Sequence, residues 1–294
     1  MTAPAFLNSF VDDAAIFPPG NLPLAEAVMQ HRTHRASGYA DLVGGFVVSD
    51  LRIPELVTVV EELAQGASRI PLAVNVVVTG GAGAIEPAVT WVNRSEPITL
   101  RAVEFALRDE DDLAHNARRL VTVVHGLGEV LDDVIVYAEL PIPLGDPTHG
   151  WSAALDELAA AEIPLKFRTG GVTADAFPAS ERLAVCIEAA LDRELAFKCT
   201  AGLHRAVRHR DEQTGIVHHG FLNLLLATRT SLDGGGVSEV TRALEETDAE
   251  AIAARLVGDP DLFARTRRWF TSFGSCSVRE AHEDLIELEL MGDA

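Results

Sequence analysis

The chain has 294 residues, of which 48% are hydrophobic and 23% are charged, and its formal net charge is −20 at pH 7. These proportions are ordinary for a soluble globular protein, and no apolar run is long enough to be a membrane span. The acidic charge argues against nucleic acid and anionic membrane surfaces as partners, because both select basic proteins. An anionic ligand would therefore need a local basic pocket.

Apolar, β-branched runs alternate with helical patterns along the whole chain, which is typical of parallel strand–helix units. The predicted strands are Ser9–Phe17, Ala40–Ser49, Pro71–Val78, Thr99–Leu107, Val134–Leu140, Pro164–Thr169, Leu195–Thr200 and Phe270–Gly274. The predicted helices are Leu22–Ser37, Ile53–Ala67, Ala84–Asn93, Asp111–Leu131, Trp151–Ala161, Ala179–Arg193, a longer helical stretch over Phe221–Trp269, and Val278–Leu290. This pattern, without an interdomain linker, predicts a (β/α)8 TIM barrel over residues 1–294 as a single domain. A doubly wound open sheet is the alternative, because alternation alone does not prove closure.

Two helix starts carry local signals. Asn21 precedes the first helix, and Ser277 with Glu280 forms an S-x-x-E capping box at the last one. A long interruption separates the seventh and eighth strands: a polar loop, a helix, the turn Gly234-Gly235-Gly236 and two further helical stretches. We expect this insertion to cover one side of the barrel mouth or to form an oligomer contact.

Alternation of side chains along a strand predicts which residues face the barrel interior. On the sixth strand, Leu165 and Phe167 suit the helix-facing side, so Lys166 and Arg168 turn inward. The same argument places further polar side chains inside or together on one face: Glu104, Arg108, Tyr137, Glu139, Lys198 and Thr200. Ionisable groups near the C-terminal ends of barrel strands are typical of catalytic sites, and a structural ion-pair network is the alternative.

Lysine is rare in this chain, since 2 of the 24 basic residues are lysines, Lys166 and Lys198. An amine can lose its proton and attack a carbonyl carbon, whereas a guanidinium group stays charged. A second ammonium on the next strand would lower the pKa of the first. The pattern favours a Schiff-base lysine with an electrostatic activator. The alternative is that both amines bind an anionic group without covalent chemistry.

Two segments carry a family resemblance. Residues 166–182 read KFRTGGVTADAFPASER and residues 197–202 read FKCTAG, which resembles the two lysine-bearing strands of the deoxyribose-phosphate aldolase family of class I aldolases. The resemblance implies that Lys166 forms the Schiff base, that Lys198 lowers its pKa, and that Glu104 relays protons with water. Arg168 replaces a small hydroxyl residue of the family, and the second motif lacks the family's proline-containing glycine pair. These departures concern the substrate more than the chemistry.

The strand ends and loops supply further candidates. Glu139 joins Lys166, Lys198 and Glu104 as a candidate catalytic residue. The turn Gly274-Ser275-Cys276 leads into the last helix, whose N-terminus suits a phosphate or carboxylate, with plain capping by Ser277 as the alternative. The basic loop after the seventh strand is expected to attract an anionic substrate. The predicted substrate-binding residues are Asp13, Arg168, Thr200, His204, Arg205, His218, His219, Gly274, Ser275 and Cys276.

Cysteines and histidines give weaker signals. The three cysteines, Cys186, Cys199 and Cys276, are widely spaced and odd in number, so we expect reduced thiols. Cys276 at a helix start has some nucleophile character, but no histidine is adjacent in sequence. A metal held by His204, His218 or His219 with Glu104 or Glu139 is an alternative without a fixed-spacing motif, so no cofactor is expected.

The sequence therefore predicts a cytoplasmic lyase of class I aldolase type that acts on a small oxo substrate carrying phosphate or carboxylate. The N-terminal segment has no basic region followed by an apolar run, so no secretion signal is predicted. A metal-assisted lyase, a sugar-phosphate isomerase or transferase, and a non-catalytic binding barrel are the alternatives. Association into a homo-oligomer is compatible with all of them.

Overall fold

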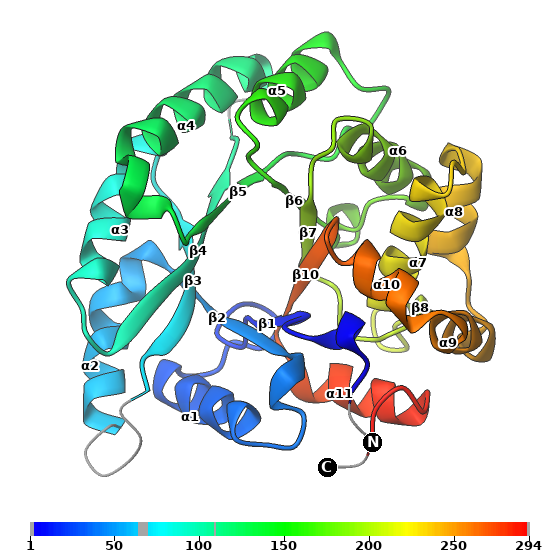
Figure 1. Cartoon of the computed structure of the whole chain (residues 1–294), viewed down its shortest axis with the longest axis horizontal. Coiled ribbons are helices and arrows are strands. Elements are labelled where there is room, and N and C mark those ends of the chain that lie inside the picture. Colours follow the sequence, from blue (N-terminus) through cyan, green and yellow to red (C-terminus); the bar gives the residue numbers. More distant parts are fainter. Residues whose placement is uncertain (1–2, 64–69, 109, 293–294) are drawn as a thin grey trace.

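The computed structural model describes residues 3–63, 70–108 and 110–292. Eight parallel strands of this part of the chain close into a barrel in the order β1-β10-β7-β6-β5-β4-β3-β2 (Figure 1). The barrel strands are β1 Val11–Asp13, β2 Val43–Ser49, β3 Leu72–Val78, β4 Ile98–Ala106, β5 Ile135–Glu139, β6 Leu165–Arg168, β7 Phe197–Thr200 and β10 Phe270–Ser275. The predicted (β/α)8 TIM barrel is confirmed, and the open-sheet alternative is excluded.

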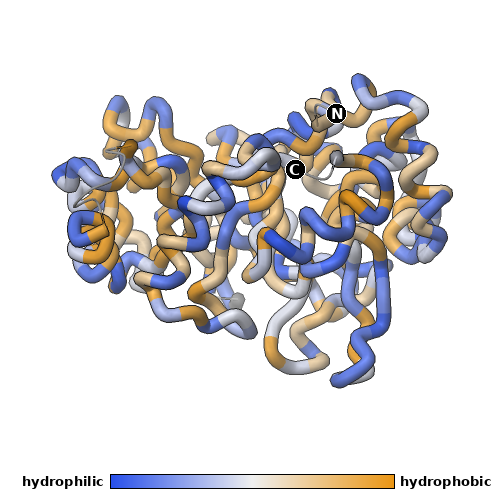
Figure 2. The backbone as a smooth tube through the Cα atoms, turned by 90° about the horizontal axis from the view of Figure 1, so that it is seen from below, coloured by the Kyte–Doolittle hydropathy of each residue, from blue (hydrophilic) through white to orange (hydrophobic). Residues whose placement is uncertain are grey.

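Helices form a ring outside the barrel (Figure 1). They are α1 Leu24–Arg35, α2 Ile53–Leu63, α3 Ile85–Asn93, α4 Leu113–Leu127, α5 His149–Ala160, α6 Ser180–Leu191, α7 Phe221–Leu232, α8 Val237–Glu245, α9 Ala249–Gly258, α10 Pro260–Thr266 and α11 Val278–Glu287. Hydrophobic and hydrophilic stretches alternate along most of the backbone, as expected when each element has one packed face (Figure 2). None of the helices in the described residues has the length and apolar character needed to cross a lipid bilayer.

The first strand is shorter than predicted. β1 covers three residues, Val11–Asp13, instead of Ser9–Phe17. The Ala14 amide still donates to the Ser275 carbonyl, but the Phe17 amide turns back to the Ala14 carbonyl, so the chain leaves the sheet before Pro18. The predicted helix start at Asn21 is wrong, because Asn21 has a left-handed φ of 48° and α1 begins after Pro23.

Other boundaries also shift. Residues Ala40–Leu42 form a 3-10 turn, so β2 starts at Val43. Residues 64–67 of the second predicted helix lie outside the described residues. The capping box before the last helix is confirmed in its forward half, because the Ser277 hydroxyl accepts the Glu280 amide. The Glu280 side chain binds elsewhere, as described below.

The insertion between β7 and β10 is confirmed, with one more break than predicted. Three helices rather than two follow the glycine turn, because Asp259 caps α10 with Pro260 in its first turn. Helices α7 to α10 pack on the outside of the barrel between α6 and α11 (Figure 1). The segment 201–220, which contains the small hairpin of β8 (His209–Arg210) and β9 (Val217–His218), lies before these helices. Residues Ala201, Gly202 and His204 of this segment line the pocket at the barrel mouth, so the insertion reaches one side of the mouth through its loop. Its helices lie outside the barrel (Figure 1).

A cluster of phenylalanines fastens the insertion to the barrel. The Phe10 ring lies edge-on to Phe221 of α7 and to Phe270 and Phe273 of β10, with centroid distances of 6.0, 5.3 and 5.0 Å. The Arg267 guanidinium stacks over Phe10 at 4.0 Å and donates to the carbonyls of Phe6 and Phe270. These contacts hold the ends of β1 and β10, and hence the site between them, in place.

We expect Phe10→Ala to lower the free energy of unfolding by about 3–5 kcal/mol, because a fully buried ring is removed from a tightly packed cluster. Urea unfolding followed by circular dichroism measures the change. Leu51→Ala is the control, since Leu51 is 78% exposed and should change stability by about 0.5 kcal/mol or less. A similar small loss for both variants would contradict this role of the cluster.

Candidate active site

The two lysines lie side by side in the barrel interior and share one carboxylate. Lys166 of β6 pairs in register with Lys198 of β7. The Glu104 carboxylate of β4 stands between them, with Oε2 at 2.6 Å from Lys166 Nζ and Oε1 at 2.7 Å from Lys198 Nζ. All three side chains are almost completely buried. Glu104 therefore links both amines through its two oxygens.

Each lysine has a second carboxylate of its own. Glu139 Oε2 lies 2.8 Å from Lys166 Nζ, and Glu139 Oε1 accepts from Arg168 at 3.0 Å. Asp12 Oδ2 lies 2.6 Å from Lys198 Nζ. The amines thus do not face each other as bare cations. The carboxylates and amines form the kind of buried ion-pair network that the sequence offered as the alternative to a catalytic arrangement.

Asp12 is anchored by donors from several strands. Besides Lys198, it accepts hydrogen bonds from Ser272 Oγ at 2.8 Å, from the Gly45 amide at 3.0 Å and from Arg101 at 3.2 Å. A Cβ atom on Gly44 would lie 2.3 Å from Asp12 Oδ1. The glycine at position 44 therefore makes room for the aspartate.

The charges settle the protonation states of the acids. Burial alone would raise the pKa of Glu104, but the Lys166 and Lys198 ammonium groups outweigh burial and lower it to about 2. Burial would also raise the pKa of Asp12, but the positive charges of Lys198 and Arg101 outweigh burial and lower this pKa. For Lys198, burial would lower the pKa, but Asp12 and Glu104 raise it well above its ordinary value. Glu104, Asp12 and Lys198 are therefore ionised at neutral pH.

A cavity of about 350 Å³ opens above this network, a size suited to a small molecule. Lys166 and Glu104 belong to its wall, together with six of the predicted substrate-binding residues: Arg168, Thr200, His204, Gly274, Ser275 and Cys276. Lys198 instead lies over the ring of Tyr137, 5.3 Å from its centroid. The Tyr137 hydroxyl forms a hydrogen bond with the Thr271 hydroxyl, and both residues line a different pocket. Lys166 is therefore the amine that a ligand in the cavity can reach.

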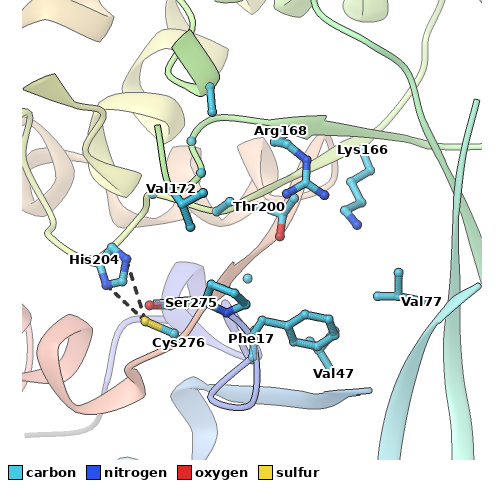
Figure 3. A pocket seen from close by; sticks show the side chains of 18 of the residues that line it. Phe17, Val47, Val77, Lys166, Arg168, Val172, Thr200, His204, Ser275 and Cys276 are labelled. Carbon is cyan, nitrogen blue, oxygen red and sulfur yellow. Dashed lines mark hydrogen bonds between the residues drawn. The ribbon is translucent and has the colours of Figure 1, made fainter. Parts of the chain in front are cut away.

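The opposite wall of the cavity holds a thiol and an imidazole. Figure 3 shows Cys276 and His204 in contact, across the pocket from Lys166. Cys276 Sγ lies 3.5 Å from His204 Nδ1, and Glu280 Oε2 lies 3.2 Å from the same nitrogen. The hydrogen bonds with Cys276 and Glu280 raise the pKa of His204 to about 10, against the effect of burial. Sequence spacing gave no sign of this contact, because 72 residues separate the two positions.

Four predicted substrate-binding residues are not part of the wall. Asp13 turns outward, where its carboxylate binds His31 of α1 at 3.0 Å and the Ala15 amide at 3.1 Å. Asp12, and not Asp13, contacts a lysine in the barrel interior, because neighbouring residues of a strand face opposite sides.

The other three lie in the loop after β7. Arg205 pairs with Asp284 at 3.2 Å. His219 is buried, and its Nε2 lies 2.9 Å from the Pro178 carbonyl oxygen. His218 packs against Phe177 with a centroid distance of 4.4 Å. Among the described residues, no group of three or more His, Cys, Asp or Glu side chains is arranged to hold a metal ion.

Sequence reasoning chose Asp13 in place of its neighbour Asp12 and missed Arg101. Arg101 was hidden by a bulge, since the register of β3 with β4 runs from Val74–Leu100 directly to Asn75–Ala102 and skips it. An extra residue interrupts the alternation on which the inward–outward assignment depends. Arg108, predicted to face inward, lies beyond the end of β4 in a neighbouring groove.

We expect stability to fall as the pH drops from about 4.5 towards 2. Glu104 has a folded pKa below its ordinary value of 4.5, so its stabilising contribution is complete above that value and is lost as protons bind the folded protein near pH 2. Urea unfolding at a series of pH values measures this loss. In Glu104→Gln, the loss on acidification should be smaller, and the variant should already be less stable at pH 7 by about 3–5 kcal/mol, because two buried amines lose a charged partner.

Glu61→Gln is the control for this measurement, because it removes the same charge from an exposed position. It should follow the pH profile of the unchanged protein. If Glu104→Gln and Glu61→Gln gave the same profile, the bridging carboxylate would not be a source of the acid sensitivity.

Comparisons with known proteins support the architecture. Neither the family models nor the curated proteins include a match to this chain. Among solved structures, the chain is similar to a deoxyribose phosphate aldolase from Aeropyrum pernix, described as having a unique tetrameric structure. The match has 12% sequence identity and a TM-score of 0.53, and it covers 98% of this chain and 94% of that chain. At this identity the similarity shows that the two proteins share the barrel fold.

Proposed function

We propose that this chain is a lyase of class I aldolase type, in which Lys166 forms a Schiff base with a small oxo substrate. The observation that carries the proposal is the position of Lys166 Nζ: it lies at the wall of the cavity between two carboxylates, 2.6 Å from Glu104 and 2.8 Å from Glu139. A barrel fold shared with an aldolase is consistent with this chemistry.

The geometry provides for each proton that the reaction moves. Attack by Lys166 on a carbonyl carbon needs the neutral amine, and Glu104 or Glu139 can accept its proton directly. A carbon–nitrogen bond then forms, the carbonyl oxygen leaves as water, and the product is an iminium ion. The iminium keeps a positive charge between the same two carboxylates, so neither acid loses its buried partner.

The iminium ion then serves as an electron sink. The bond between the α and β carbons breaks, its electron pair forms an enamine with the iminium carbon, and a carboxylate takes the proton of the β-hydroxyl group. An aldehyde leaves, and the carboxylate returns the proton to the α carbon of the enamine, which becomes an iminium ion again. Water then hydrolyses this iminium ion to the carbonyl product and the free amine. Condensation follows the same steps in reverse.

Lys198 is a positioning residue in this proposal. Its ammonium holds one oxygen of Glu104, and Asp12 holds the ammonium in turn, so the second oxygen of Glu104 stays directed at Lys166. The sequence suggested that the Lys198 ammonium activates Lys166. Because carboxylates lie against both amines and compensate their charge, we assign Lys198 to the positioning of Glu104 instead. The same compensation makes a simple anion clamp by the two lysines less favourable.

Anion recognition is assigned to other parts of the wall. Arg168, whose side chain is 53% exposed, and His204 present cations at the mouth, and the turn Ser275-Cys276 leads into the N-terminus of α11. Such a wall suits a phosphate or carboxylate group on the substrate. An anionic substrate also explains why a protein with a charge of −20 gathers cations at this rim.

Borohydride trapping tests the proposal. The protein is incubated with a panel of small aldehydes and 2-oxo acids, with and without phosphate groups, then reduced and mapped by mass spectrometry. We expect a reduced adduct on Lys166 and at least a tenfold lower yield on Lys198, which is enclosed. The assignment is simple, since the chain has two lysines and one α-amino group.

Lys166→Arg is the matched variant, because it keeps a cation between Glu104 and Glu139 but cannot form an imine. It should lose the adduct and the carbon–carbon bond cleavage while retaining the fold. Full activity of Lys166→Arg, or trapping confined to the α-amino group, would overturn the covalent mechanism and favour a binding barrel or a non-covalent enzyme.

A further inference from the structure

The contact between Cys276 and His204 brings two distant segments of the chain together at one wall of the cavity. Cys276 lies in the turn between β10 and α11, His204 in the loop after β7, and Glu280 in the first turn of α11. Cys276 Sγ lies 3.5 Å from Nδ1 and 3.8 Å from Nε2 of the imidazole. Gly20 leaves room for the Cys276 side chain, since a Cβ atom at position 20 would lie 3.0 Å from Cys276 Cβ. The sulfur lies within contact distance of both ring nitrogens.

The surrounding charges favour a protonated imidazole. Glu280 is the carboxylate in contact with His204, at 3.2 Å. Arg205 is paired with Asp284, and burial and the neighbouring histidines lower the pKa of His218, whose ring centroid lies 6.3 Å from that of His204. Burial likewise lowers the pKa of His209. His204 is therefore the histidine of this group that carries the charge.

Cys276 contacts this imidazolium ion and lies just before the N-terminus of a ten-residue helix, which are two settings in which cysteine thiols act as nucleophiles. Both neighbours place positive charge beside the sulfur. Cys276 and His204 both line the cavity, so an uncharged electrophile there meets a nucleophile and a proton donor together. By contrast, Cys186 and Cys199 are completely buried.

We propose that Cys276 and His204 form a second reactive centre of the cavity, which captures an aldehyde reversibly as a hemithioacetal. The sulfur attacks the carbonyl carbon, the carbon–sulfur bond forms, and the π electron pair moves to the oxygen. The imidazolium donates its proton to that oxygen, so the adduct and a neutral imidazole result without any oxidant or reductant. Collapse of the adduct reverses each step.

The proposed function supplies the aldehyde in the cell, but the reactivity of the thiol does not depend on it. Lyase chemistry at Lys166 would release an aldehyde in the same cavity, across from Cys276. Capture there would retain that fragment while the enamine on Lys166 persists. The second centre thereby deepens the proposed function, because capture as a hemithioacetal implies that the released fragment is an aldehyde and not a ketone.

Alkylation kinetics test the pair in the Lys166→Arg background, in which no imine forms. Iodoacetamide labelling is followed by mass spectrometry at pH 6 to 8, with the buried Cys186 and Cys199 as internal references. We expect the Cys276 rate to change by about threefold or less over this range, whereas an ordinary thiol loses about tenfold per pH unit below its pKa. His204→Gln should restore the steep dependence, and Glu280→Gln should give an intermediate one.

Propanal then tests capture in the same background. It should slow alkylation of Cys276 at pH 7, and removal of the aldehyde by gel filtration should restore the rate. The proposal is overturned if the Cys276 alkylation rate depends steeply on pH in Lys166→Arg with His204 intact, or if propanal leaves that rate unchanged. Trapping on Lys166 in the unmodified chain is measured separately, so failure at one centre is distinguishable from failure at the other.

Discussion

The Glu104 carboxylate, shared by two buried ammonium groups, is the interaction on which the rest of the site depends. An isolated charge inside the barrel would be very costly, and a pair of amines more so. One carboxylate between two ammonium groups does not balance both positive charges, so each amine needs a further acid beside it. Asp12 and Glu139 are these acids. Among their own donors, Ser272 and Gly45 extend the network to β10 and β2, while Arg101 and Arg168 lie on β4 and β6.

This network also explains why two lysines in adjacent register positions have different surroundings. Lys166 ends at the wall of the cavity, next to an acid that is shared with a rim arginine. Lys198 ends over Tyr137 and is enclosed by Asp12 and Glu104. The difference follows from the stagger of barrel strands, which brings register partners to different depths along the barrel axis. In the proposed mechanism, Lys166 is the amine that reacts, and Lys198 holds the Glu104 carboxylate beside it.

The two walls of the cavity for which we propose reactivity differ in how they are built. The lysine wall comes from the middle of rigid strands, where charges are compensated on all sides. The wall with Cys276 and His204 comes from a loop and a helix start, where a backbone dipole and one exposed carboxylate set the charge. Strand-borne groups are held in fixed geometry, while loop-borne groups adapt to the substrate. The phenylalanine cluster beneath β1, β10 and α7 keeps the two walls in register with each other.

The sequence by itself determined the barrel, the strand positions, the inward direction of Lys166, Lys198 and Glu104, and the place of the long insertion. These features depend on short-range periodicity, which side-chain alternation and apolar runs record locally. The sequence did not predict the ends of the first strand or the division of the insertion into four helices. The turns before Pro18 and around Asp259 depend on hydrogen bonds rather than on periodicity.

Only the tertiary structure decided which aspartate binds Lys198, which lysine reaches the cavity and which histidine meets Cys276. A one-residue error in the inward–outward assignment exchanges Asp12 for Asp13, and the bulge at Arg101 breaks the alternation altogether. The contact between His204 and Cys276 joins residues that are far apart in the chain. Such contacts arise from the closure of the barrel, which brings the ends of distant strands together, and no local pattern in a single sequence encodes them.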